Sequence, residues 1–280
     1  MSSEEYQESL WAALDDSPPH HLYHYTPLDG MRGILSSSVF WASDIRHMND
    51  TSEEDYAYNV VRDALAERRD ILSDKLADSF QRHAGIPGFG ITWFRYAVCF
   101  CGARDLLSRW RGYTPEEGGV ALAVRFASLR QYAGDEFALI RVLYDRQRQS
   151  QMVHMLMDRA LALWREFPPK SQAEADEFLG SVGYYLIELM LRFKNPTFAE
   201  EQEWRVLLIT WAGENSTSLH YRYRGGKPVP YIEWPFRAEY LDEVLIGPGP
   251  HGINEVRLRE ILRACGFGHV RTAQSTIPLR

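Results

Sequence analysis

The residues best suited to chemistry stand at the start of an apolar segment, in residues 200–208. Charged and apolar side chains alternate there, with Glu201, Glu203 and Arg205 set against Trp204, Val206 and Leu208. Because successive side chains of a strand point to opposite faces, this pattern predicts an apolar core face and a polar face. Arg205 can orient Glu203 in a polar cleft through a bidentate pair. The alternative is a solvated edge strand whose surface ion pairs contribute little to stability.

Two more polar candidates lie near the N-terminus. His24 stands in an aromatic strand beside Tyr25, where its imidazole either packs in the core or contacts a ligand. Asn49 is followed by Asp50 and Thr51, just before a predicted helix. Capping of that helix by Asp50 or Thr51 is the alternative to a ligand-binding role for this segment.

An aromatic and basic segment, residues 106–113, lies between two predicted strands. It contains Arg109, Trp110, Arg111 and Tyr113 in the order Arg-Trp-Arg-Gly-Tyr. Trp110 and Tyr113 suit a stacking surface for an aromatic ligand, with the arginines adding charge. The alternative is simple packing of a crossover segment between the strands.

The elements that must position these residues predict an α+β fold. Strands are expected near 21–25, 39–42, 96–101, 119–126, 138–144, 204–211, 229–234, 242–247 and 269–275. Amphipathic helices are expected at 4–14, over 53–83, at 150–167, through 178–193 and at 253–264. Strict βαβ alternation is missing, which favours α+β over a doubly wound fold. We predict an N-terminal helix and turn in residues 1–20 and one domain over 21–280, with a helical insertion at 146–195.

Composition limits the classes of function. The net charge of −7 argues against a broad basic surface for nucleic acid, although a local basic groove stays open. Cys99, Cys101 and Cys265 form no disulfide or metal pattern, so we expect no metal and a reducing compartment. The acidic N-terminus lacks a signal peptide, and no apolar run reaches the length of a membrane span. We therefore expect a cytoplasmic protein without a membrane partner.

Taken in order, several segments resemble the bacterial family of domain of unknown function 2971. Its pattern is carried by Leu22-Tyr23-His24-Tyr25, Met48-Asn49-Asp50-Thr51-Ser52-Glu53, Asp105 with Trp110-Arg111-Gly112-Tyr113, Phe193-Lys194-Asn195-Pro196, Glu201-Gln202-Glu203-Trp204-Arg205, Val244-Leu245-Ile246-Gly247-Pro248 and Ser275-Thr276-Ile277-Pro278. The resemblance covers nearly the whole chain after residue 20. The family name itself implies no activity.

A second resemblance does imply an activity. An aromatic strand with a histidine, a following helix and a later Glu-x-Glu entering an apolar strand are similar to ADP-ribosyltransferases. The resemblance implies a mixed sheet core with helical insertions and NAD as co-substrate without metal. It implies that His24 holds the cofactor ribose and that Glu203 polarises its 2′-hydroxyl, with Glu201 as the companion carboxylate. Tyr113 is the candidate for stacking on nicotinamide, but no Ser-Thr-Ser of the middle strand is present.

We therefore expect NAD-dependent transfer of ADP-ribose to an unknown protein or nucleic acid, in a toxin-like or phage-defence setting that the family context suggests. A regulatory partner is also conceivable. Two alternatives stay open, a non-catalytic module that binds a nucleotide or nucleic acid and an NAD glycohydrolase. The enzyme hypothesis expects one pocket lined by catalytic Glu203, Glu201 and His24 with cofactor-binding His24, Tyr25, Asn49, Trp110, Tyr113 and Arg205. It also expects that Glu203→Gln leaves folding intact, because the polar face takes no part in the core.

Overall fold

The computed structural model describes residues 18–47, 53–83, 93–113, 118–133, 137–211, 219–249 and 253–278. Within these residues, helices are interspersed with mostly antiparallel strands, which confirms the predicted α+β class. The chain divides into two compact units, each assembled from segments far apart in the sequence. Unit 1 comprises Met1–Ser38, Phe100–Gly134 and Phe236–Arg280, and unit 2 comprises Val39–Cys99 and Asp135–Pro235.

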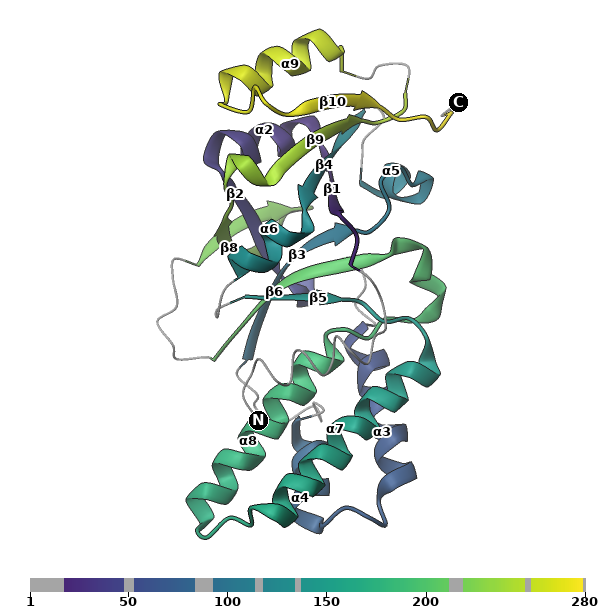
Figure 1. Cartoon of the computed structure of the whole chain (residues 1–280), viewed down its shortest axis with the longest axis vertical. Helices are drawn as coiled ribbons and strands as arrows, with labels where there is room; N and C mark the ends of the chain where they lie inside the picture. Colours follow the sequence, from purple (N-terminus) through teal and green to yellow (C-terminus); the bar gives the residue numbers. More distant parts are fainter. Residues whose placement is uncertain are drawn as a thin grey trace. The chain divides into compact units, whose positions relative to one another are not determined.

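Unit 1 is built on four strands in the order β10–β9–β4–β1 (Figure 1). These strands are β1 (His21–Pro27), β4 (Gly119–Arg125), β9 (Leu241–Ile246) and β10 (Arg271–Gln274). The β9–β10 pair is parallel, while β4 is antiparallel to both β1 and β9. Between the strands lie α2 (Leu28–Ser37), α5 (Leu107–Tyr113), α6 (Phe126–Ala133), the short 3-10 helix η3 (Ala238–Tyr240) and α9 (Glu255–Ala264).

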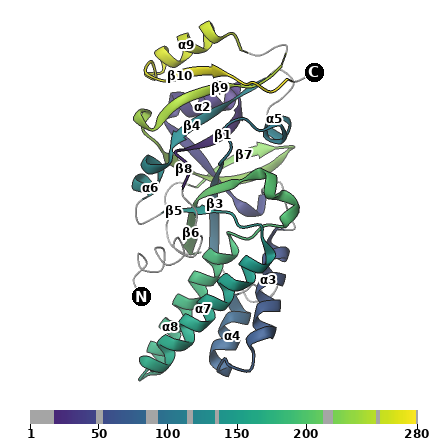
Figure 2. The same cartoon turned by 45° about the vertical axis from the view of Figure 1, so that its right-hand side comes forward.

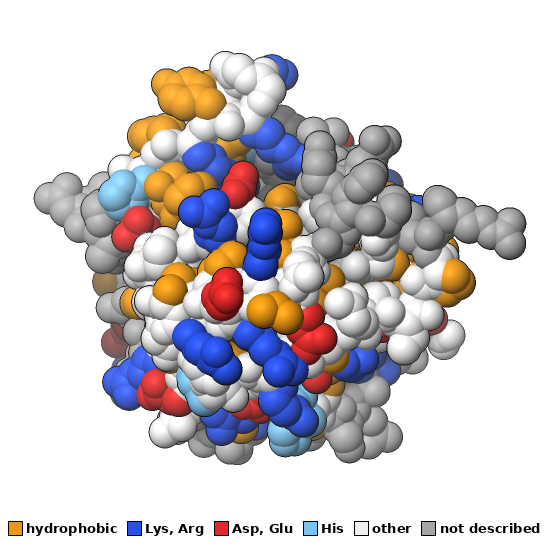
Figure 3. Space-filling view, turned by 90° about the horizontal axis from the view of Figure 1, so that it is seen from above, with side chains coloured by type: hydrophobic (Ala, Val, Ile, Leu, Met, Phe, Trp, Pro, Cys, Tyr) orange, Lys and Arg blue, Asp and Glu red, His pale blue; other side chains and the backbone are white. Residues whose placement is uncertain are grey.

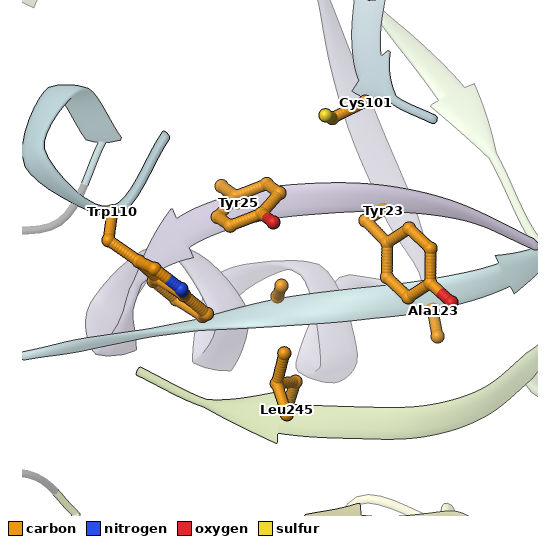
Figure 4. Close-up of a cluster of buried hydrophobic side chains, with 7 residues drawn as sticks. Tyr23, Tyr25, Cys101, Trp110, Ala123 and Leu245 are labelled. Carbon is orange, nitrogen blue, oxygen red and sulfur yellow. The ribbon is translucent and has the colours of Figure 1, made fainter. Parts of the chain in front are cut away.

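An aromatic cluster fills the core of unit 1 on one face of β1 (Figure 4). Tyr23 and Tyr25 stand opposite Ala123 and Ala121 of β4, and these small partners leave room for the two rings. Trp110 of α5 packs edge-to-face on Tyr25, with 4.7 Å between ring centroids. The cluster is completed by Cys101 and Leu245. Bulky and small residues from different strands therefore interdigitate at this face.

In the described part of unit 2, four α-helices pack against one another (Figure 1). They are α3 (Glu53–Arg68), α4 (Asp74–His83), α7 (Arg146–Glu166) and α8 (Gln172–Met190). Side chains cap the N-termini of α7 and α8, where Asp145 accepts from the Arg148 N–H at 2.7 Å and Ser171 from the Glu174 N–H at 3.2 Å. Such caps satisfy amide groups that have no partner within the helix.

The strands of unit 2 form two branches from β3 (Trp93–Cys101), whose last two residues belong to unit 1. One branch runs through β2 (Val39–Asp44) and β8 (Lys227–Pro235) to β7 (His220–Arg224), and β7 and β8 form a hairpin (Figure 2). The other runs through β6 (Glu203–Trp211) to β5 (Ala138–Arg141). Two 3-10 helices, η1 (Ile45–His47) and η2 (Pro196–Glu201), also belong to this unit.

The Gly225-Gly226 turn of the hairpin requires glycine. Its two residues have φ values of +55° and +77°, a combination that side-chain-bearing residues rarely adopt. Two-residue turns with positive φ match the right-handed twist of the flanking strands. Neither this hairpin turn nor β7 was predicted from the sequence.

Most of the expected elements are present, with shifted ends. Residues 146–166 and 172–190 form α7 and α8, and most of residues 53–83 form α3 and α4. That 146–195 is an insertion stays a prediction. The segment between the strands at 96–101 and 119–126 contains a helix, α5, which its short Leu107–Tyr113 span had hidden. The predicted helix at 4–14 and the turn after it, up to residue 17, lie outside the described residues, and the single-domain prediction stays a prediction.

Gly247 offers a direct test of the packing of unit 1. A Cβ added there would lie 2.8 Å from Cζ3 of Trp110 and 2.9 Å from the carbonyl oxygen of Gly119. Since the backbone oxygen cannot move away without breaking its bond from the Gly247 N–H, we expect Gly247→Ala to lower the free energy of unfolding by about 1–3 kcal/mol. Chemical denaturation measures this change.

Gly180→Ala is the matched control, because nothing lies within 4 Å of a Cβ added at that position in α8. It should raise the unfolding free energy by about 0.5–1 kcal/mol, since alanine favours helix interiors over glycine. Equal effects from the two substitutions would contradict the close contact at Gly247.

Candidate functional site

The carboxylates of the Glu-x-Glu segment lie in a buried place at the start of β6. Glu203 is 4% exposed and Arg205 is 1% exposed, while Trp204 and Val206 on the other face are also buried. The alternation of faces therefore holds, but the polar face is not open to solvent. The alternative of a solvated edge strand is wrong for these two residues, because β6 has β3 on one side and β5 on the other. The polar cleft stays a prediction.

Glu203 is held between two cations, one on each carboxylate oxygen. Nε of Arg205 donates to Oε1 at 2.8 Å, and Nζ of Lys194 donates to Oε2 at 2.8 Å. Nη1 of Arg205 also donates to the carbonyl oxygen of Leu191 at 2.9 Å. The predicted Arg205–Glu203 pair is therefore present, but as a single contact through Nε rather than a bidentate pair. The second contact to the carboxylate comes from Lys194.

Two more carboxylates complete this site. Lys194 Nζ lies 2.5 Å from Oε2 of Glu201 and 3.7 Å from Oε2 of Glu53. Arg205 Nη1 lies 2.5 Å from Oε1 of Glu53. We call the five side chains Glu53, Lys194, Glu201, Glu203 and Arg205 the carboxylate cluster. All five belong to unit 2, and Glu201, with a quarter of its side chain exposed, is the most accessible of them.

Local backbone structure brings Lys194 and Glu203 together although nine positions separate them. The Lys194 N–H donates to the carbonyl oxygen of Leu143, and Asn195 then caps η2 by accepting from the Thr197 N–H. After η2, Gln202 takes a left-handed conformation with φ of +44°, which turns the chain into β6. The Glu203 N–H donates to Oη of Tyr144 at 3.0 Å.

The electrostatics of the carboxylate cluster favour full ionisation of its core. Burial alone would raise the pKa of Glu203, but Arg205 and Lys194 outweigh it and hold that pKa well below its usual range. Burial likewise opposes the charge of Lys194, yet Glu203 and Glu53 raise its pKa above the usual value. The pKa of Arg205 is raised in the same way by Glu203 and Glu53. The cluster therefore keeps a fixed negative charge on Glu203 at neutral pH.

Two weakly acidic groups border the cluster and stay protonated. Burial, followed by the Glu203 charge, raises the pKa of the Tyr144 hydroxyl. The same two causes raise the pKa of the Cys99 thiol well above its ordinary value. Cys99 is therefore a poor nucleophile at neutral pH, since the thiolate is the reactive form.

Sequence reasoning missed three participants, Lys194, Glu53 and Tyr144. Lys194 and Glu53 do stand in segments of the family pattern, Phe193-Lys194-Asn195-Pro196 and the one that ends at Glu53. The available signal was that Lys194 stands only a few residues before Glu201 and Glu203. Two carboxylates that become buried need a cation to balance them, and this lysine is close enough in the sequence to supply it. No local pattern points to Tyr144.

The other predicted site residues lie in unit 1 or outside the described residues. The His24 ring, in β1, packs edge-to-face against Phe100 at 5.7 Å. Tyr113 is 37% exposed, with the Arg109 guanidinium 5.2 Å over its ring. Asn49 lies outside the described residues. Since His24 and Tyr113 belong to unit 1 and Glu203 to unit 2, the single shared pocket stays a prediction.

Trp110 and Tyr25 are core residues of unit 1. Trp110 is 1% exposed, and its Nε1 donates to Asp105 Oδ1 at 2.7 Å. The Tyr25 hydroxyl lies 3.1 Å and 3.0 Å from the carbonyl oxygens of Ala103 and Arg104 and accepts from the Leu106 N–H. These contacts favour the packing interpretation for both rings. Their role as ligand contacts stays a prediction.

The Asp105 carboxylate accepts several hydrogen bonds beside the aromatic core of unit 1. Besides Trp110, its carboxylate accepts from Ser275 Oγ at 2.7 Å and from the N–H and hydroxyl of Thr276. Burial raises the pKa of Asp105, but the hydrogen bonds from Trp110, Ser275 and Thr276 outweigh it and lower that pKa. The carboxylate thereby fastens the segment after β10 to α5.

Comparison with known proteins identifies part of the chain. A family model described as a protein of unknown function, DUF2971, matches residues 109–206. The matched stretch is about a third of the chain and contains Lys194, Glu203 and Arg205. No curated protein and no solved structure matches this chain. None of these comparisons supports similarity to ADP-ribosyltransferases.

Neither a metal-binding group nor a membrane-spanning helix is found among the described residues. Among them, no three His, Cys, Asp or Glu side chains are grouped so that they could hold a metal ion. Over the same residues, no helix combines the length and the apolar character that crossing a membrane requires.

The burial of Glu203 corrects the expectation that Glu203→Gln leaves folding intact. The amide cannot balance the buried charges of Lys194 and Arg205, so we expect the free energy of unfolding to fall by about 3–5 kcal/mol at pH 7. Chemical denaturation monitored by circular dichroism measures the loss. Glu239→Gln is the control, because its ion pair with Arg237 is more than half exposed and should change stability by less than about 0.5 kcal/mol. Similar losses in both variants would contradict the structural role of the cluster.

The same charges predict a characteristic pH dependence of stability. The lowered pKa of Glu203 gives a contribution that is present above the unfolded-state pKa, about 4.3, and is lost as the pH falls through the folded-state pKa. The raised pKa of Lys194 gives a contribution present below about pH 10.4 and lost as the pH rises further. Denaturation midpoints should therefore drop on the acid side of about pH 5. In Glu203→Gln this acid dependence should be shallower, and an unchanged slope would show that Glu203 does not titrate as described.

Proposed function

We propose that this chain is an NAD-dependent ADP-ribosyltransferase in which the carboxylate cluster provides the charge for the reaction. The observation that carries the proposal is the pair Glu201 and Glu203 bound to one ammonium, Lys194, with Glu203 ionised and Glu201 partly exposed. The Glu-x-Glu spacing that resembles these enzymes supports it from the sequence.

The chemistry needs a fixed negative charge. Breaking the bond between nicotinamide and C1′ of the ribose leaves a cationic, oxocarbenium-like centre, and nicotinamide departs with the bonding electrons. An ionised carboxylate in a place with little water stabilises that cation more than it would in water. The acceptor then forms a new bond to C1′ and gives up its proton. Glu201 is exposed enough to receive that proton, while the negative charge of Glu203 stabilises the cationic ribose.

The remaining roles follow from the resemblance and from exposure. His24 is proposed to hold the ribose and Tyr113 to stack on the nicotinamide, and the exposed ring of Tyr113 can accept a partner. The acceptor is a protein or a nucleic acid. As part of the same proposal, the sheet of this chain corresponds to the mixed sheet core of ADP-ribosyltransferases.

A second function is favoured by a specific observation. Both oxygens of Glu203 are engaged by cations, an arrangement that also serves a purely structural cluster. In that case the chain is a non-catalytic binding module, and the cluster holds α3, η2 and β6 in place. Hydrolysis of NAD without an acceptor is the remaining alternative.

The test measures NAD consumption by the purified chain with labelled NAD and a cell lysate, followed by separation of protein, nucleic acid and small molecules. We expect label in a macromolecular fraction. Glu203→Gln should reduce turnover per folded molecule by about 10²–10³-fold, the scale for losing one electrostatic stabiliser of a transition state. Glu201→Gln should reduce it less or release free ADP-ribose.

The control is Glu188→Gln, which also removes a buried carboxylate from an ion pair in unit 2, with Arg192 at 2.9 Å. It should lose stability but keep its turnover per folded molecule, so it separates chemistry from folding. Wild-type chain that consumes no NAD, or equal turnover in Glu203→Gln and Glu188→Gln, would remove the enzyme proposal. Free ADP-ribose as the only product would establish the hydrolase.

A further inference from the structure

One face of unit 2 combines an exposed aromatic ring with basic side chains that the carboxylate cluster does not use. It is formed by β2, β8 and β7, whose directly opposed residues share a face in an antiparallel sheet. Register places Ser43, Tyr231 and His220 in one row across the three strands. We call this face, with Trp41, Ser43, His220, Arg222, Arg224, Lys227, Tyr231 and Glu233, the hairpin face.

Stacked rings form the floor of the hairpin face. Trp41 stacks on Tyr231 with 4.6 Å between centroids, and His220 stacks on the same ring at 5.4 Å. Tyr231 is consequently buried, whereas Trp41 remains 46% exposed. An exposed indole held flat by a ring below it loses little freedom when a further planar group stacks on it. The hairpin face therefore presents a ready-made platform for a planar ligand.

Basic side chains lie on this face between the platform and the hairpin turn, and no carboxylate among the described residues pairs with them. The Arg222 guanidinium lies over the Trp41 ring, 5.9 Å from its centroid, and donates from Nη2 to Ser43 Oγ, while its buried Nε finds no acceptor among the described residues. Arg224 and Lys227 stand directly opposite each other across the hairpin, an arrangement of like charges that destabilises a strand pair. Within the described part of the chain, none of these three cations forms an ion pair. Burial and the charge of Arg224 lower the pKa of Arg222.

Another surface of the same chain shows the contrast. Over α9 and β10 of unit 1, seen from above in Figure 3, Lys and Arg side chains are interspersed with Asp and Glu. There Arg259 pairs with Glu255 at 2.7 Å and also bonds to Thr272. A basic residue that is paired with an acidic one in the same chain already has its charge neutralised, so it attracts an external anion less strongly. Those of the hairpin face are unbalanced in a chain whose net charge is −7.

We propose that the hairpin face binds single-stranded RNA. Its ring platform fits an unstacked base, and its cations fit phosphates along the strand, since residues two apart on β7 are roughly 6.6–6.8 Å apart. A duplex hides its base faces, so a single strand is required. Glu233, exposed and directly opposite Trp41, places a hydrogen-bond acceptor beside the platform, where a ribose 2′-hydroxyl can donate to it. The proposal is independent of NAD chemistry, because it shares no residue with the carboxylate cluster.

The test uses fluorescence anisotropy of a labelled 12-nucleotide RNA titrated with the full chain over a range of salt concentrations. Trp41→Ala should weaken binding by about 5- to 150-fold, the range for losing one stacked base. Arg224→Gln, a change at an exposed position, should reduce the slope of log K against log salt by about 0.7, the value for one phosphate contact on a single strand. Melting temperatures confirm that both variants are folded.

Tyr223→Ala is the matched control, since Tyr223 is 77% exposed on the same strand but alternates to the opposite face. It should bind like the wild type. Absence of RNA binding by the wild type, or unchanged binding in both Trp41→Ala and Arg224→Gln, would overturn the proposal.

Three competitors sharpen the result. Equal binding of the DNA strand of the same sequence would overturn the assignment to RNA, and equal binding of duplex RNA would overturn stacking on Trp41. Full displacement by inorganic polyphosphate, together with unchanged affinity in Trp41→Ala, would reduce the hairpin face to a simple anion site. Weaker competition by all three supports the proposal.

Discussion

Glu203 carries a negative charge where little water reaches it, and that charge persists because Lys194 and Arg205 each bind one of its oxygens. Removing a carboxylate from water is costly, so an isolated Glu203 would take up a proton instead. The two cations reverse this preference, and Glu53 balances them from the first turn of α3. The interaction joins α3, the segment after α8 and the start of β6, which stand up to about 150 residues apart in the sequence. The same ion pairs therefore hold these three segments together and keep Glu203 ionised, whether the charge serves catalysis or only stability.

In unit 1 a partly buried carboxylate, that of Asp105, is stabilised by neutral hydrogen-bond donors instead of cations. Asp105 lies near the aromatic core, and its oxygens accept from Trp110, Ser275 and Thr276. Hydrogen bonds to a charged acceptor are stronger than those between neutral groups, so a single carboxylate can fix both an indole and a chain segment. This explains why Trp110 is packed tightly enough that Gly247 admits no side chain beside it. The aromatic residues of unit 1 are ordered by this polar contact as much as by apolar burial.

Local patterns predicted the elements well and their environment poorly. Alternation around Glu203 correctly separated the two faces of β6, and the helical spacing over 53–83 and 150–167 located α3, α4 and α7. The alternation of side chains along a strand predicts which residues share a face. Whether that face is exposed to solvent depends on the neighbouring elements, which the alternation does not indicate. The burial of Arg205 therefore depended on the pairing of β6 with β5 and β3, which no local pattern reveals although both strands were predicted. Partners such as Tyr144 are contacts of the tertiary structure, and β7 was missed because its tyrosines and arginines alternate without an apolar face.

The discontinuous make-up of unit 1 bears on how the chain is synthesised. Among the described strands β1 is synthesised first. Its partner β3, paired at Tyr23 and Cys101, follows about 80 residues later, its other partner β4 about 100 residues later and β9 about 220 residues later. At translation rates of about 5–20 residues per second, β1 waits roughly 4–16 s for its first antiparallel neighbour, β3, and roughly 5–20 s for β4. During that wait its apolar side chains, including Leu22, are exposed to other nascent chains, and long-range strand pairing is intrinsically slow. The sheet of unit 1 is complete only after β9 and β10 have been synthesised, so β1 stays without its full set of neighbouring strands while the roughly 250 residues that follow it are added.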